Sequence, residues 1–464
     1  MLGTVRCPLS AMQFVDKCVG PVCYCLSYNR VKMQIPKMPF WAAGLILAIY
    51  GTSGGADSSG KGPFRVGLLQ QITNAHATEK DGEVTFLNPL WSANGALLAY
   101  ENLSENTQRL YIHRYSPGDT THSVEVVSSE AGSDMDPGLD PGGFAQQQAF
   151  ANFGLSWSST GSFVYVGSGG KGYPGIYRSN LSNMEIKGYT LLAGGDDAEA
   201  YVDFPAYHTR LGYVVYAQGS AWAGKVPEGS RIDREARLSL FGMPEGIDIK
   251  KGQSPYPLGV ETATDGDLSG ILQLEPSFSP VGDDVVFTGI DIAENNNNIY
   301  RLNLSIVIMP RLTSLNVDSW APLTKWPSAE GRPQWSPDGQ YIAFLSTKDQ
   351  KKNEWGLFVV DANGTTEPRK LVDRVINHDF PEWHPDGQHI FFVRQDEIAN
   401  NPIQYINIHA GPGQEETLET GTSLHNYLDI TPDGQRIAFC AKGRETDANL
   451  TWWKLYTADL KFNE

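Results

Sequence analysis

Short runs in which apolar and polar residues alternate recur along the chain from about residue 86 onwards. Each run follows a large apolar residue and a turn rich in Pro, Asp or Gly, as in PQWSPDGQYIAF (333–344) and PEWHPDGQHIFF (381–392). A period of two is typical of half-buried β-strands, and Pro followed by Gly suits a tight turn. Each copy therefore predicts a β-hairpin.

Seven copies align on the large apolar residue before the turn, which we call the anchor. The anchors are spaced by 66, 50, 71, 57, 48 and 47 residues and are Trp91, Trp157, Tyr207, Phe278, Trp335, Trp383 and Ile430. Periods near 40–50 residues with longer outliers are typical of four-stranded propeller blades that carry loop insertions. We therefore predict an all-β fold, a seven-bladed β-propeller, with six blades as the alternative if the weak copy at Tyr207 belongs to an insertion.

The two ends of this repeat region complement each other. The last unit stops after its third strand, near Leu460, and a spare strand, 66–73, precedes the first unit. Pairing of the two ends would remove exposed strand edges. We expect this N-terminal strand to close the ring of a propeller domain that covers residues 64–464.

The repeats resemble those of the TolB-type propeller family, which is related to WD40-like repeats. The resemblance rests on the turns at 336–339 and 385–387, and it covers residues 64–464. It implies a propeller of six to eight blades. TolB proteins carry an α/β domain before the propeller, whereas only about 30 residues separate the apolar segment near residue 45 from the first repeat here.

The N-terminal part reads as a targeting segment. A basic residue, an apolar run from Phe40 to Tyr50 and the small residues up to Ala56 are typical of a secretory signal peptide, and the run is too short to span a bilayer. We expect residues 1–56 to be leader and signal peptide, with Met33 as an alternative start, and 57–63 to be a linker. The prediction is a periplasmic or secreted protein whose mature chain has no stable membrane insertion; an uncleaved anchor is the alternative.

Charge and motifs exclude several function classes. The formal net charge is −17, and because residues 1–56 carry +4, the remainder carries −21. Such a surface repels phosphate backbones, so we predict no nucleic-acid partner. The sequence 51–55 matches the nucleophile pattern G-x-S-x-G, but it lies where neither strand nor helix is expected.

One set of polar positions suggests a site in the central channel. Five residues before each anchor, at the start of each innermost strand, the chain has Gln273, Glu330, His378 and His425 in four successive repeats. Two imidazoles and a carboxylate suit a divalent metal, which could activate water or acidify a proton beside a uronate carboxylate. The alternative, which we favour, is hydrogen bonding between blades and to channel water.

These observations favour a non-enzymatic module that binds a protein or glycan, without a cofactor and without catalytic residues. Long insertions, above all 217–272, would carry the binding loops. The alternative is a metal-dependent polysaccharide lyase or hydrolase at the channel, similar to the oligogalacturonate lyases, which are propellers with channel histidines.

Overall fold

The computed structural model describes residues 62–462 except for the following gaps: 73–84, 104–106, 117–122, 131–154, 159–161, 169–173, 183–184, 195–200, 209–211, 220–237, 245–254, 259–270, 292–293, 295, 310–311, 352–353, 378, 397–400 and 444–452. The predicted leader, signal peptide and most of the linker lie outside the described residues. Within the described part, no helix has the length and apolar character needed to cross a membrane. Pro63–Glu464 form one compact unit.

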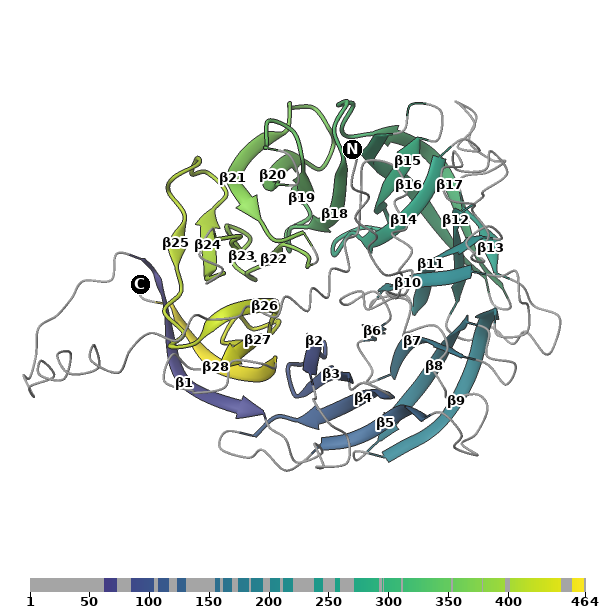
Figure 1. Ribbon diagram of the computed structural model, residues 1–464. Coiled ribbons are helices and arrows are strands. Elements are labelled where there is room, and N and C mark those ends of the chain that lie inside the picture. Colours follow the sequence, from purple (N-terminus) through teal and green to yellow (C-terminus); the bar gives the residue numbers. More distant parts are fainter. Residues whose placement is uncertain are drawn as a thin grey trace, which may run out of the picture. The chain divides into compact units, whose positions relative to one another are not determined.

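The described residues form seven four-stranded antiparallel sheets (Figure 1). The first three are β2 (Thr85–Trp91), β3 (Leu97–Leu103), β4 (Thr107–Arg114) and β5 (Ser123–Glu130); β6 (Leu155–Trp157), β7 (Ser162–Ser168), β8 (Pro174–Ser182) and β9 (Glu185–Gly194); and β10 (Tyr201–His208), β11 (Tyr213–Gly219), β12 (Leu238–Pro244) and β13 (Tyr256–Pro257).

The next three sheets follow the same plan. They are β14 (Ile271–Phe278), β15 (Val285–Asp291), β16 (Asn296–Met309) and β17 (Leu312–Pro322); β18 (Glu330–Trp335), β19 (Tyr341–Ser346), β20 (Trp355–Asp361) and β21 (Arg369–Val375); and β22 (Glu382–Trp383), β23 (His389–Val393), β24 (Ile403–Asn407) and β25 (Glu416–Thr417).

The last sheet joins the two ends of the propeller unit. It contains β26 (Ser423–Ile430), β27 (Arg436–Gly443), β28 (Lys454–Phe462) and β1 (Phe64–Ile72). β1 pairs antiparallel with β28, from Phe64 opposite Phe462 to Ile72 opposite Leu455. The predicted closure by an N-terminal strand is confirmed.

The anchors mark the innermost strand of each sheet. Six of these strands end at their anchor, and β10 ends one residue after Tyr207. Tyr207 therefore belongs to a sheet and not to an insertion. The expectation that 217–272 is mainly an insertion was wrong in part, because this stretch supplies β12 and β13, the two outer strands of the third sheet. The predicted all-β propeller is confirmed.

Apolar side chains fill the spaces between successive sheets. Ile112 of β4 and Trp157 of β6 share one cluster, Val215 of β11 and Phe287 of β15 share another, and Leu98 of β3 packs in a third with Cys440 of β27. Each sheet thus buries both of its faces against neighbours, which explains why its central strands are nearly continuous apolar runs.

Three of the turns that follow an anchor have the predicted chemistry. In Ser336–Gln340, the Ser336 hydroxyl donates to the Asp338 carboxylate at 2.5 Å and accepts a hydrogen bond from the Tyr341 amide at 2.9 Å. Gly339 has φ of +69°, a conformation that a residue without Cβ adopts at little cost. Ser92 and Thr431 make the same contacts in their repeats.

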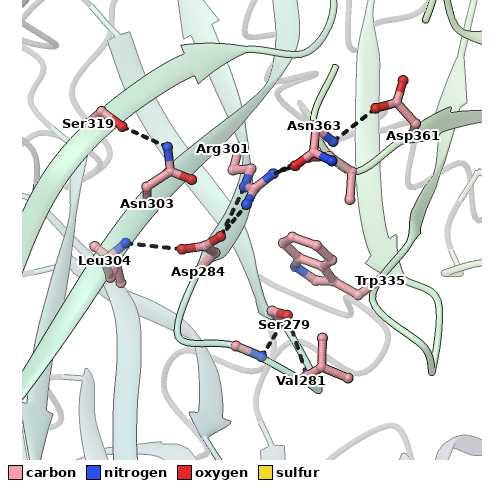
Figure 2. A network of polar contacts seen from close by, with 12 residues as sticks. Ser279, Val281, Asp284, Arg301, Asn303, Leu304, Ser319, Trp335, Asp361 and Asn363 are labelled. Carbon is pink, nitrogen blue, oxygen red and sulfur yellow. Dashed lines mark hydrogen bonds and ion pairs between the residues drawn. The ribbon is translucent and has the colours of Figure 1, made fainter. Parts of the chain in front are cut away.

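Arginine side chains link neighbouring sheets. Arg301 of β16 binds the Asp284 carboxylate in its own sheet, and it donates to the Ala362 carbonyl and the Asn363 side chain in the next (Figure 2). Its guanidinium lies 5.6 Å from the ring centroid of the anchor Trp335. Arg436 has the equivalent relation to Gly95 and Trp91. The anchors are therefore held from the preceding sheet.

Candidate functional site

A cavity of about 500 Å³ lies where the seven innermost strands end. Its wall includes the residue immediately before each of the seven anchors, and these residues are Leu90, Ser156, Ala206, Ser277, Gln334, Glu382 and Asp429. Because every innermost strand contributes one residue at the same position of its repeat, the cavity surrounds the axis of the ring.

A β-bulge sets the direction in which these side chains point. Register shifts interrupt the pairing of the innermost strand in five sheets, shortly before the anchor. The residue three positions before the anchor has positive φ in all five, and these residues are Asn88, Phe204, Glu275, Arg332 and Tyr427. In four of the five, the next residue is a proline, which lacks an amide hydrogen and fits the unpaired position of a bulge.

The bulge also changes which residues point the same way. Positions five and one before an anchor are four apart and would share one face of a regular strand. One additional residue between them reverses the alternation. The position that we predicted to face the channel is therefore separated from the ring of residues that lines the cavity.

Gln273 and Glu330 of the predicted channel set lie between sheets. Gln273 is fully buried, and its side-chain oxygen accepts a hydrogen bond from the Leu240 amide of the preceding sheet at 3.0 Å. Glu330 is also fully buried, and its carboxylate accepts hydrogen bonds from Ser328 at 2.7 Å and Ser346 at 2.9 Å. Burial raises the pKa of Glu330 to about 7, although these hydroxyls oppose the shift.

His425 lies in a separate environment. Its Nδ1 is 2.9 Å from the Asn401 carbonyl oxygen, and its Nε2 is 2.8 Å from the Thr420 hydroxyl and 2.9 Å from that of Thr422. Burial lowers the pKa of His425 to about 4, so its imidazole is neutral at pH 7. The hydrogen bonds of Gln273, Glu330 and His425 thus go to different segments of the chain.

The fourth member of the predicted set, His378, lies outside the described residues, so the set as a whole stays a prediction. Among the residues that the structure describes, there is no group of three or more His, Cys, Asp or Glu side chains placed to hold a metal ion.

Acidic side chains concentrate on one side of the cavity. Asp429 accepts hydrogen bonds from the Trp91 amide and, at 2.9 Å, from the Ile430 amide. Asp379, outside the wall, accepts from the Leu428 amide at 2.8 Å. Burial raises the pKa of Asp379 to about 7, and burial with repulsion from neighbouring carboxylates raises those of Asp429 and Glu382.

A second carboxylate position is neutralised by an arginine. Glu275 is buried, and its carboxylate accepts hydrogen bonds from the Arg332 amide at 2.8 Å and the Thr288 hydroxyl at 2.7 Å. The Arg332 guanidinium lies 3.5 Å from the same carboxylate. Glu275 therefore links the sheet of β14 to the sheet of β18 through Arg332, although it also lines the cavity.

The remaining wall is largely aromatic. Its rings come from four innermost strands and the segment before β22, and they belong to Trp91, Trp157, Phe204, Tyr207, Phe278 and Phe380. A concave site with apolar rings and a few polar groups can bind a small organic ligand or the end of a larger one.

Sequence reasoning missed this wall, although a signal was present. The residue before the anchor is polar in five of the seven repeats, namely Ser156, Ser277, Gln334, Glu382 and Asp429. A polar residue next to a buried anchor and a proline is unusual for a core strand, and it marks the position as facing the cavity.

Comparisons with known proteins identify only the fold. No protein-family model matches the chain, and no curated protein matches its sequence. A puromycin-hydrolysing peptidase from Mycobacterium tuberculosis is similar in structure at 11% identity and a TM-score of 0.50, over 82% of this chain and 53% of that one.

Two further solved structures are similar at lower scores. An oligogalacturonate lyase in complex with manganese aligns at 14% identity and a TM-score of 0.49, over 84% of this chain and 93% of that one. TolB from Acinetobacter baumannii aligns at 14% identity and a TM-score of 0.37, over 82% and 65%. At such identities the likeness extends to the propeller fold and not to an activity.

Proposed function

We propose that this chain is a TolB-like, seven-bladed β-propeller that acts as a non-enzymatic binding module and holds a protein or glycan ligand at its axial cavity. The main support for this proposal is the cavity wall, to which every innermost strand contributes a residue at the same repeat position. Aromatic rings supply apolar contact area there, and carboxyl groups supply hydrogen bonds.

A substitution that fills the cavity tests this proposal. Ala93 is exposed and lines the cavity, so Ala93→Trp would occupy the space without removing a buried contact. Ala96 is exposed in the same turn but is absent from the wall, and Ala96→Trp is the matched control. We expect binding to immobilised glycans and peptides to fall in the first variant only. Equal binding by both variants would contradict an axial site.

The metal-dependent lyase or hydrolase remains the alternative from sequence. It requires His378 and His425 to bind a divalent metal, whereas the described contacts of His425 are to Asn401, Thr420 and Thr422. Metal analysis of the purified protein beside the double variant His378→Ala, His425→Ala tests it. Stoichiometric metal that disappears in the variant would favour the enzyme over the binding module.

We also propose that the protein is exported, to the periplasm or out of the cell, on the basis of the apolar segment 40–50. Fractionation of cells that express the full chain, with N-terminal sequencing of the product, tests this proposal. A product that starts near residue 57 in the exported fraction is expected, and an intact cytoplasmic chain would contradict it.

A further inference from the structure

The axial cavity has two chemically different sides. Most of its aromatic rings come from the first four sheets in chain order, on the innermost strands β2, β6, β10 and β14. Two wall carboxyl groups that have no arginine partner among the described residues, those of Glu382 and Asp429, come from the sixth and seventh sheets. Successive sheets are neighbours in the ring (Figure 1), so the two acids lie together and the rings cover much of the remaining wall.

No basic side chain balances the acidic side of the described wall. The described residues that line the cavity include no Lys, Arg or His, and Arg332, which lies nearby, pairs with Glu275 at 3.5 Å. Asp429 accepts two backbone amides. Glu382 is partly exposed, and its carboxyl group accepts no hydrogen bond from a described residue. Glu382 can therefore pair with a group that a ligand brings into the cavity.

The surroundings of Glu382 favour a neutral carboxyl group until a positive charge arrives. Burial raises the pKa of Glu382 well above its usual range, and repulsion from Asp429 and Asp379 adds to the shift. Among the described residues, the further charged or titratable side chains that interact with these acids are Arg332, Tyr427 and Cys440. A cation bound beside Glu382 would stabilise its charged form and would displace a proton.

A lysine or arginine side chain matches both sides of the cavity, because its aliphatic stem can pack against the rings while its charged end donates to a carboxylate. A neutral hydroxyl would leave the acidic side unbalanced, and the net charge of −21 outside residues 1–56 opposes an anionic ligand. We propose, building on the axial binding function above, that the cavity binds a cationic side chain of a protein ligand, with Glu382 as its charge partner and the aromatic rings packed against its stem.

The test is isothermal titration calorimetry of the full chain with blocked tripeptides, acetyl-Ala-X-Ala-amide, in which X is lysine, arginine or norleucine. Norleucine keeps an aliphatic stem and lacks the charge. We expect the lysine or the arginine peptide to bind about tenfold more tightly than the norleucine peptide. Equal affinity for the norleucine peptide, or no binding of either cationic peptide, would overturn the proposal.

Titrations in two buffers of different ionisation enthalpy measure protons released on binding, and we expect release at pH 7. Glu382→Gln keeps the size of the side chain and ends the repulsion from Asp429, so it should fold. It should weaken binding of the cationic peptides about fivefold or more and reduce the proton release. Glu367→Gln removes a charge at an exposed position outside the wall and is the matched control. Unchanged affinity in Glu382→Gln, or an equal loss in both variants, would overturn the role of Glu382.

Spermidine and cellobiose are the remaining probes. Spermidine binding about tenfold tighter than that of the cationic peptides would assign the site to a free polyamine and overturn the protein source. The Ala93→Trp variant separates this proposal from the axial site itself. If no cationic peptide binds, and cellobiose binds the native chain but not Ala93→Trp, the axial site stands while the cationic assignment fails. If binding of a cationic peptide survives in Ala93→Trp, the axial site fails.

Discussion

The buried carboxyl group of Glu330 allows a quantitative test of the packing between sheets. Glu330 is fully buried among the hydroxyls of Ser328, Ser346 and Thr324, and burial raises its pKa from 4.5 to about 7. The folded protein therefore holds a proton that the unfolded chain releases between about pH 4.5 and pH 7. Because the raised pKa belongs to the folded state, this group's contribution to stability is complete below pH 4.5 and is lost as the pH rises through 7.

The size of the effect follows from the shift. A change of about 2.5 pKa units corresponds to roughly 3 kcal/mol of unfolding free energy between pH 4.5 and pH 8. Glu330→Gln removes this dependence, because glutamine resembles the protonated acid and can still accept hydrogen bonds from the surrounding hydroxyls. We expect the variant to match the native protein near pH 5 and to exceed it by about 3 kcal/mol at pH 8.

Urea unfolding followed by tryptophan fluorescence measures this difference, with the free energies of variant and native protein compared at each pH. Asp379 and Asp429 also have raised pKa values, so the native protein should lose stability with rising pH even without Glu330, and only the difference isolates this group. Glu367→Gln, at an exposed position, is the matched control for the change from carboxyl to amide. A difference for Glu330→Gln that is the same at pH 5 and pH 8 would refute the reasoning.

Three further substitutions test the fold by urea unfolding. Phe64→Ala should lower the free energy of unfolding by about 3–5 kcal/mol. The Phe64 side chain on the closing strand is only 4% exposed, and its ring centroid lies 5.0 Å from those of Phe391 and Tyr405. A loss below about 1 kcal/mol would show that closure contributes little. Gly289→Ala should lower the free energy of unfolding by about 1–3 kcal/mol, since an added Cβ would lie 2.7 Å from Ile271 and would overlap Tyr300. Gly411 has open space around it, so Gly411→Ala should change the stability little. Equal effects of the two substitutions would contradict the described packing. Trp335→Phe should cost about 1 kcal/mol more than Trp91→Phe, because among the described residues only the Trp335 indole has a hydrogen-bond acceptor. A larger loss for Trp91 would argue that its N–H has an acceptor inside the protein.

The repeat was predictable because its signals are local. A proline, an anchor and a Pro-Asp-Gly turn specify a hairpin from neighbouring residues alone, and the spare strand 66–73 followed from the incomplete last unit. The strand observed, β1, begins two residues earlier and ends one residue earlier than predicted. The stretch 217–272 was misjudged in part, because its strands β12 and β13 lack the repeat pattern and β13 has only two residues.

The orientation of the cavity wall could not be read from alternation alone. The prediction for Gln273 and Glu330 assumed a regular strand, whereas Glu275 and Arg332 adopt positive φ and shift the register between those positions and the anchors. The prolines at 276 and 333 hinted at the bulge, since proline is disfavoured inside a regular central strand. The hydrogen bond from the Trp91 amide to the Asp429 carboxylate joins residues 338 apart in sequence, and no local pattern encodes that contact.

Closure by β1 sets an order of events during biosynthesis. Phe64 leaves the ribosome long before Phe462, its partner in the sheet, so the first strand must wait until almost the whole chain has been translated. Until β28 has emerged and β1 has paired with it, the sheet formed by β26 and β27 lacks its two outer strands, and pairings between residues so distant in sequence form slowly. A β1 segment from a second molecule could pair with β28 in the same register, so crowded synthesis favours exchange of this strand between chains, and the earliest misfolded product should be a strand-swapped dimer.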